Sequence, residues 1–157
     1  MASQKITPFL WFDTQAEEAA SFYTSVFKNS RILHVSRYGD AGPGPKGSAM
    51  VVNFQLAGQE FTALNGGPSF KFSEAFSFVV NCENQREIDE YWTKLTADGG
   101  QESMCGWLKD KFGFSWQIVP AELGKLMSNP QKANRVMEAL LKMRKLDLAA
   151  LKEAAEA

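Results

Sequence analysis

The chain has 157 residues, of which 45% are hydrophobic, and its 17 basic and 18 acidic side chains give a net charge of −1. This length fits a single domain, and the balanced charge argues against a dedicated nucleic-acid-binding protein, which usually carries a basic excess. The one histidine, His34, excludes a His-rich metal site.

The N-terminal sequence and the cysteine content predict a cytoplasmic protein. The segment MASQKITPFLWFD has no apolar stretch followed by a small-residue cleavage site, and no apolar run in the chain is long enough to cross a bilayer. Cys82 and Cys105 are too few for a disulfide scaffold. We therefore expect a reducing compartment and no membrane partner.

The first half of the chain predicts a strand, a helix and three more strands. Asp13 and Thr14 are candidate helix N-caps, and a stripe of Ala19, Phe22, Tyr23, Val26 and Phe27 follows them with helical spacing. The segment GDAGPGPKG at 39–47 is a loop. The predicted elements are strand 6–12, helix 15–27 and strands 31–38, 48–57 and 60–65.

The second half predicts the same order of elements, followed by a helical tail. The predicted elements are strand 75–82, helix 84–97, two short strands within 101–109, a turn at 110–113 and strand 114–119. The paired modules, at about 5–66 and 74–120, are expected to form one domain within residues 1–127, and residues 128–157 a C-terminal helical tail. The tail's apolar stripe of Val136, Met137, Leu140 and Leu141 must be buried on its own sheet or on a partner, and we favour a clamp on a partner.

An internal repeat relates the two halves. An offset of 69 residues places FLWFDTQAEEAASFYTSVF (9–27) on FVVNCENQREIDEYWTKLT (78–96). Phe9 and Phe78 are identical, as are Glu18 and Glu87, and the strand, cap and helical stripe coincide. We interpret this as a duplicated strand–helix–three-strand unit, the alternative being a chance alignment of two unrelated strand–helix pairs.

These segments, together with CGWLKDKFGFSWQIVP and NPQKANRVMEALLKM, resemble the PhnB-like branch of the vicinal oxygen chelate superfamily. That superfamily includes glyoxalase I, bleomycin resistance proteins, extradiol dioxygenases and fosfomycin resistance proteins, and members of this branch are often labelled 3-demethylubiquinone-9 3-methyltransferase. The resemblance covers roughly residues 5–145. It implies an α+β fold of two βαβββ modules that form an open cleft, usually completed in a homodimer, with a divalent metal in the cleft of active members.

The positions at which the resemblance implies metal ligands hold poor ligands in this chain. A ligand near the start of the first strand is commonly His, and Thr7 is the best match here. The last ligand is typically a Glu four residues after the Gly of a D-x-x-G turn, which places Gln117 after Asp110–Gly113. An amide oxygen binds transition metals poorly, so we expect no metal and no cofactor. Glu74 is the residue that could restore a site, because the corresponding ligand of the second module falls at 74–76.

Other chemical groups give weaker predictions. His34 is expected at a strand surface or cleft edge rather than in a proton relay, and Cys82 and Cys105 as packed, unreactive thiols. The glycines lack the spacing of a nucleotide-binding turn between a strand and a helix, which argues against the methyltransferase label.

Side-chain alternation along the strands predicts an aromatic cleft with scattered amides and hydroxyls, suited to a flat or amphipathic small molecule. Its predicted residues are Thr7, Phe9, Trp11, Asn53, Gln55, Asn65, Phe76, Phe78, Ser115 and Gln117. Two functions stay open: a metal-independent small-molecule-binding protein, or an enzyme acting through non-standard metal ligands or on a quinone-like substrate. A third possibility is a dimeric scaffold whose aromatics fill a closed core.

Overall fold

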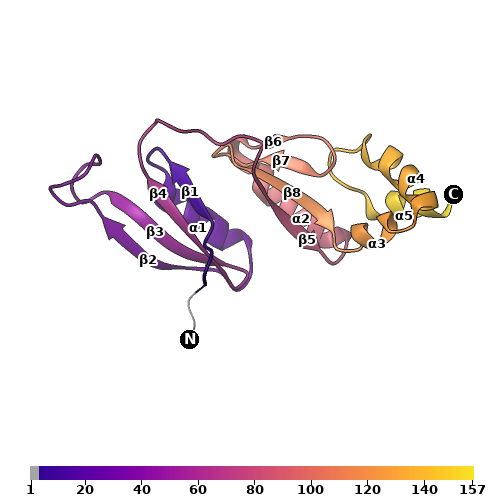
Figure 1. The fold of residues 1–157 in the computed structure, drawn as a ribbon, viewed down its shortest axis with the longest axis horizontal. Helices are drawn as coiled ribbons and strands as arrows, with labels where there is room; N and C mark the ends of the chain where they lie inside the picture. The colour runs from indigo at the N-terminus through magenta and orange to yellow at the C-terminus, as the bar shows by residue number, and fades with distance from the viewer. Residues whose placement is uncertain (1–3) are drawn as a thin grey trace. The chain divides into compact units, whose positions relative to one another are not determined.

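The computed structural model describes residues 4–157 and divides the chain into two compact units, one that ends at Phe72 and one from Ser73 to Ala157 (Figure 1). The first unit contains β1 (Phe9–Phe12), α1 (Ala16–Val26), β2 (Arg31–Arg37), β3 (Ala49–Leu56) and β4 (Gln59–Asn65). The second contains β5 (Ser77–Cys82), α2 (Gln85–Thr96), the 3₁₀ turn η1 (Ala97–Gly99), β6 (Gln101–Glu102), β7 (Trp107–Lys109) and β8 (Ser115–Pro120). The helices α3 (Leu123–Met127), α4 (Pro130–Leu140) and α5 (Leu148–Glu156) follow.

The two sheets have the same topology. Their strand orders are β1-β4-β3-β2 and β5-β8-β7-β6. In each sheet the first and last strands of the module pair in parallel, and the remaining pairs are antiparallel. This confirms the predicted α+β fold of two βαβββ modules with C-terminal helices. The prediction that the modules form one domain stays a prediction.

Helix α1 covers one face of the first sheet (Figure 1). Its buried side chains are mostly alanines, which let the helix backbone approach the strands closely, and Tyr23 packs against Phe54 with ring centroids 6.4 Å apart. Phe54 in turn stacks on Phe61 at 5.5 Å. The core of this unit includes Leu10, Phe12, Ala16, Ala19, Ala20, Tyr23, Val26, Val52, Phe54, Leu56, Phe61 and Ala63. Because buried and half-buried residues alternate along β3, the opposite face of the sheet carries a separate set of side chains.

The start of α1 differs from the prediction. Gln15 is the N-cap and makes no side-chain cap, so neither Asp13 nor Thr14 caps the helix. The Ala16 N–H instead donates to Asn65 Oδ1 at 2.8 Å. Sequence patterns identify caps made by local residues, whereas this cap comes from the end of β4, 49 residues away.

The second unit packs α2 on its sheet in the same way. Asn84 caps the helix by accepting from the Glu87 N–H, and Glu87 Oε2 accepts from the Glu83 N–H. These reciprocal bonds are close to a capping box. The core contains Cys82, Ile88, Trp92, Leu95, Leu108, Phe114, Trp116 and Ile118.

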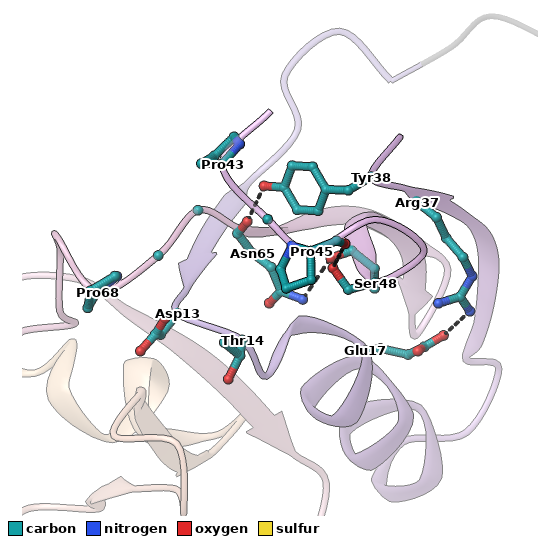
Figure 2. Close-up of a pocket in the computed structure, with 14 residues that line it drawn as sticks. Asp13, Thr14, Glu17, Arg37, Tyr38, Pro43, Pro45, Ser48, Asn65 and Pro68 are labelled. Atoms are coloured by element: carbon teal, nitrogen blue, oxygen red, sulfur yellow. Dashed lines mark hydrogen bonds and ion pairs between the residues drawn. The ribbon is translucent and has the colours of Figure 1, made fainter. Parts of the chain in front are cut away.

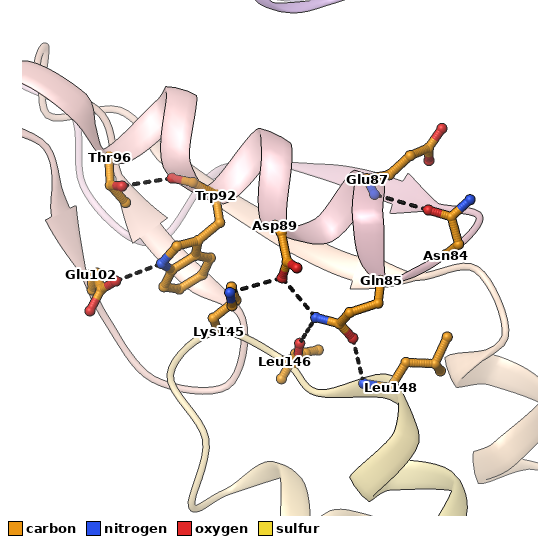
Figure 3. A network of polar contacts seen from close by, with 10 residues as sticks. All are labelled: Asn84, Gln85, Glu87, Asp89, Trp92, Thr96, Glu102, Lys145, Leu146 and Leu148. Carbon is orange, nitrogen blue, oxygen red and sulfur yellow. Dashed lines mark hydrogen bonds and ion pairs between the residues drawn. The ribbon is translucent and has the colours of Figure 1, made fainter.

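The C-terminal tail packs within its own unit. Val136, Leu146, Leu151 and Ala155 form a buried cluster, and Val119 of β8 packs against it. Figure 3 shows how Gln85 at the start of α2 holds the tail: its Nε2 donates to Leu146 O and its Oε1 accepts from the Leu148 N–H. Lys145 also pairs with Asp89 at 2.8 Å. These contacts favour the tail's own sheet, rather than a partner, as the place where its apolar stripe is buried.

Among residues 4–157, no helix has the length and the apolar character that a membrane span requires.

Part of the apolar stripe predicted for the tail stays exposed. Val136 is buried, whereas Met137 on α4 and Leu141 at its C-cap are exposed. The α4 stripe is therefore divided between the unit's own core and the surface.

Candidate functional site

The face of the first sheet that α1 does not cover carries aromatic, amide and hydroxyl side chains. Strand register places Phe9, Thr62, Asn53 and His34 in one row across the four strands. Asn53 Nδ2 donates to Thr62 Oγ1 at 3.1 Å, and the Phe9 side chain is 58% exposed. We call this surface the first open face. Of the predicted cleft residues, it contains Phe9, Trp11, Asn53 and Gln55.

Trp11 is held in place at the edge of the first open face. Its Nε1 donates to Gly67 O at 2.9 Å, and its ring meets Phe70 edge-on with centroids 4.9 Å apart. A Cβ at Gly66 would lie 2.3 Å from the Trp11 ring, so the chain passes the indole closely only because residue 66 is glycine. The indole is therefore a rigid, half-buried aromatic surface.

The second sheet has an equivalent face, which we call the second open face. Register places Gln101, Lys109, Ser115 and Ser77 in one row across β6, β7, β8 and β5. In the neighbouring row, Trp107 of β7 pairs with Gln117 of β8. Gln117 Nε2 donates to Ser77 Oγ at 3.0 Å. Two predicted residues, Ser115 and Gln117, thus lie together on this face.

Phe76 and Phe78 do not share that face, and the prediction for them is wrong. Phe78 pairs with Trp116 rather than with its neighbours on β8, and it belongs to an aromatic cluster with Phe114 at 4.7 Å and Trp116 at 5.4 Å. Phe76 is 57% exposed and contacts the same cluster. The offset of 69 residues aligns helices α1 and α2, but it misplaces β5 by one residue, and a slip of one residue moves every side chain to the opposite face.

Thr7 and Asn65 lie outside the rows just described. Thr7 is exposed and precedes β1. Asn65 ends β4, where its Oδ1 accepts from the Ala16 N–H and its Nδ2 donates to Ala49 O at 3.0 Å. Asn65 thus joins β3 and β4 to the start of α1, a structural task that the sequence does not reveal.

The predicted turn at 110–113 is organised by the side chain of Asp110, a role that the sequence does not reveal. Asp110 is 2% exposed, and its Oδ1 accepts from the N–H groups of Phe112 and Phe114 at 2.9 and 3.1 Å. Its Oδ2 accepts from Trp116 Nε1 at 2.8 Å. Gly113, with φ +83°, closes the turn on Asp110 O. Asp110 therefore organises the turn that leads into β8.

The side chains at the positions of the implied metal ligands do not form a metal-binding set. Thr7 contributes a hydroxyl and Gln117 an amide that is already bonded to Ser77. Glu74 is ion-paired with Lys109, whose hydrogen bond holds the pKa of this exposed carboxyl below its usual range. Among residues 4–157, no three His, Cys, Asp or Glu side chains are grouped so as to hold a metal ion. The donors therefore do not fit the divalent metal that the superfamily implies.

The remaining candidate groups lie as follows. His34 is exposed on β2 beside a register shift, opposite Asn53. Cys82 is buried, and this burial raises the pKa of its thiol to about 12. Cys105 is half-buried with φ +61°. Ionisation of Cys82 at neutral pH is therefore strongly disfavoured.

A pocket in the first unit was not foreseen from the sequence. It has a volume of about 510 Å³ and lies between the start of α1, the end of β2 and the 39–47 loop (Figure 2). Tyr38 and Asn65 form one side, and Arg37 pairs with Glu17 at 3.1 Å. A Cβ at Gly44 would lie 2.2 Å from the Tyr38 ring, so the loop packs on that ring through glycine. The Gly and Pro residues of the loop predict a turn but no chemistry.

Comparison with known proteins supports the fold and the family. Residues 4–119 match the family model of 3-demethylubiquinone-9 3-methyltransferase. The structure of the PhnB protein from Bacillus cereus is 42% identical with a TM-score of 0.68, and the match covers 74% of this chain and 99% of that one. No protein with a curated description matches this chain.

Two more distant structures share the fold alone. A Pseudomonas aeruginosa protein is 20% identical with a TM-score of 0.62, and the match covers 75% of this chain and 98% of that one. The fosfomycin resistance protein FosX from Listeria monocytogenes is 15% identical with a TM-score of 0.57, and the match covers 82% and 100%.

Proposed function

Because the chain belongs to the 3-demethylubiquinone-9 3-methyltransferase family of the vicinal oxygen chelate superfamily, we propose that it binds a flat or amphipathic small molecule through its open faces without a metal. The observation that carries the proposal is the make-up of these faces. Each offers one half-buried tryptophan, Trp11 or Trp107, beside neutral amides and hydroxyls. Aromatic faces supply stacking area, and the fixed polar groups supply orientation.

The four tryptophans make this proposal testable by fluorescence. Trp92 and Trp116 are 3% and 2% exposed, whereas Trp11 and Trp107 are half-buried on the open faces. We expect menadione, a flat neutral quinone, to quench the emission of Trp11 and Trp107 saturably. The matched variants are Trp11→Phe and Trp107→Phe, which remove one reporter each, with Trp92→Phe as the control in a buried position.

The outcomes separate binding from non-specific quenching. If the proposal holds, the saturable signal falls in Trp11→Phe or Trp107→Phe and persists in Trp92→Phe. Linear quenching that all three variants share would refute it. Elemental analysis of the purified protein addresses the other half of the proposal, since a transition metal bound at one equivalent per chain would overturn metal independence.

Catalysis on an aromatic or quinone-like substrate is the alternative, and the family's description favours it because it names methyl transfer to a demethylubiquinone. Incubation with S-adenosylmethionine and a demethylated quinone, followed by mass spectrometry, distinguishes the two. A methylated product formed above the rate of a heat-denatured control would establish the enzyme.

We further propose that the chain forms a homodimer. Phe9, Phe76 and Val79 are large apolar side chains that stay exposed at 58%, 57% and 48%, and exposed apolar surface of this kind is typical of interfaces. Light scattering coupled to size-exclusion chromatography measures the mass directly. A monomer at micromolar concentration would contradict this proposal and would leave the ligand test unaffected.

A further inference from the structure

The second unit contains a small cavity with an unsatisfied hydroxyl. The cavity has a volume of about 220 Å³ and is lined by Glu74, Gln101, Glu102, Ser103, Trp107, Leu108, Lys109 and Ser115. Ser115 is 1% exposed, and its Oγ has no hydrogen-bond partner among residues 4–157. Burying a hydroxyl without a hydrogen-bond partner costs free energy. The Ser115 hydroxyl can therefore bond to a polar atom of a ligand.

The side chains around Ser115 indicate the chemical class of the ligand group that would bind there. Lys109 is the direct cross-strand partner of Ser115, and Gln101 is the next partner in the row, so the side chains lie next to one another on the second open face. They offer an ammonium, an amide and a hydroxyl. Donors of this kind favour an oxyanion, and a charged donor strengthens such bonds.

Two carboxylates line the cavity, and they play different parts. Glu102 pairs with Leu108, so it extends to the face that α2 covers, where its Oε1 accepts from Trp92 Nε1 at 2.7 Å (Figure 3). Glu74 is ion-paired with Lys109, and its side chain is 62% exposed. The carboxylate of Glu74 therefore already occupies the place of an oxyanion on Lys109.

We propose that this cavity binds the carboxylate or phosphate group of a small-molecule ligand through Lys109 and Ser115, and that Glu74 holds the position until the ligand displaces it. The inference rests on the proposed function, because it assigns one end of the ligand to the second open face. Trp107 also lines the cavity, so it reports on the site and offers a stacking surface to an aromatic acid.

The test titrates the full-length protein with benzoate and with inorganic phosphate, at constant ionic strength, and follows Trp107 emission and the heat of binding. Glu74→Gln removes the competing carboxylate, and we expect it to bind about two- to fivefold more tightly than the native chain, the range that an exposed ion pair allows. Lys109→Met is expected to weaken binding by about tenfold or more. Lys142→Met, at an exposed lysine outside the cavity, is the control and should not change it.

Ser115→Ala adds a readout that folding defects cannot imitate. Because it removes a buried hydroxyl without a partner, we expect unchanged or raised thermal stability together with weaker binding. Tighter binding of benzoate than of phosphate identifies a carboxylate ligand, and the reverse identifies a phosphate ligand.

Three outcomes would overturn the inference: binding of neither probe to the native chain or to Glu74→Gln, binding that Lys109→Met leaves intact, or equal affinities of Glu74→Gln and the native chain. Its failure is distinguishable from that of the proposed function. Menadione carries no charge and does not need Lys109, so saturable menadione binding without anion binding retains the function and refutes the oxyanion site.

Discussion

Replacing Asp110 with alanine removes the acceptor for three N–H groups, those of Phe112, Phe114 and the Trp116 indole. The bonds to Phe114 and Trp116 are buried, and each buried donor that loses its partner costs about 1–3 kcal/mol. The Phe112 N–H is only partly buried and can bond to water. Two buried donors give about 2–6 kcal/mol, and relief of the buried carboxylate's desolvation lowers the sum. We expect Asp110→Ala to lower the free energy of unfolding of the second unit by about 3 kcal/mol.

Asp110→Asn is the matched variant. The amide oxygen can still accept from both backbone groups, but the NH₂ group then faces the Trp116 N–H, donor against donor. We therefore expect a loss of about 1–2 kcal/mol from that one contact. Adding Trp116→Phe removes the opposing donor, so Asp110→Asn should cost less in that background than in the native chain.

Urea unfolding, followed by tryptophan fluorescence and far-UV circular dichroism, measures these losses. Trp92 and Trp116 lie in the core of the second unit and report on its transition. A loss below about 1 kcal/mol for Asp110→Ala would refute the reasoning, since even one buried orphan donor costs that much. So would equal losses for alanine and asparagine, because asparagine keeps the buried bond to the Phe114 N–H that alanine loses.

Three further predictions concern the second unit. Gly106→Ala should lower the free energy of unfolding by more than about 1 kcal/mol and loosen the tail, because φ is +83° there and a Cβ would lie 2.9 Å from Ile118 O and 3.0 Å from Leu146 Cγ. Faster amide hydrogen exchange in residues 143–151 would show this loosening, and unchanged protection would contradict it. Ellman's reagent at pH 8 should label Cys105 and spare Cys82, whose thiol has a pKa of about 12, until urea exposes both; two fast equivalents in the native chain would contradict this. The pKa of Asp89, measured by NMR, should lie below that of an ordinary aspartate because Lys145 and Gln85 bond to the carboxylate. A lowered pKa means that the Asp89 contact stabilises the fold at pH values above the pKa of the unfolded state, and that this stabilisation is lost as the pH falls through the pKa of the folded state. Lys145→Met should raise the pKa of Asp89, and an unchanged pKa would refute the assignment.

The strand and helix order of both modules was predictable from the sequence because periodicity and turn residues agree there. The β3–β4 hairpin shows why: Ala57 and Gly58 have φ +49° and +85°, a pair of positive values typical of a two-residue hairpin turn, and the glycine is visible in the sequence. Alternation likewise predicts Asn53 and Gln55 on the open face, and along β3 these two half-buried side chains alternate with the buried Val52, Phe54 and Leu56.

The parts that escaped prediction depend on contacts between distant residues. Asn65 caps α1 from β4, and Gln85 binds the tail at Leu146, 61 residues away. Neither pairing leaves a local pattern. The error at Phe78 has a different origin: helix periodicity tolerates a slip of one residue in a repeat alignment, whereas strand alternation reverses with it. A repeat aligned on its helices therefore locates the strands of the copy but not their faces.

The turn at Asp110–Gly113 separates what this fold needs from what its chemistry needs. The resemblance to the superfamily located a ligand position four residues after Gly113, and the chain places Gln117 there. The turn itself is kept by Asp110, whose carboxylate accepts bonds from the backbone and from Trp116 on the side of the sheet opposite Gln117. Because adjacent positions on β8 face opposite ways, the structural carboxylate and the ligand position can change independently. The D-x-x-G turn is therefore kept in this chain without a carboxylate at the ligand position, where the side chain is an amide bonded to Ser77.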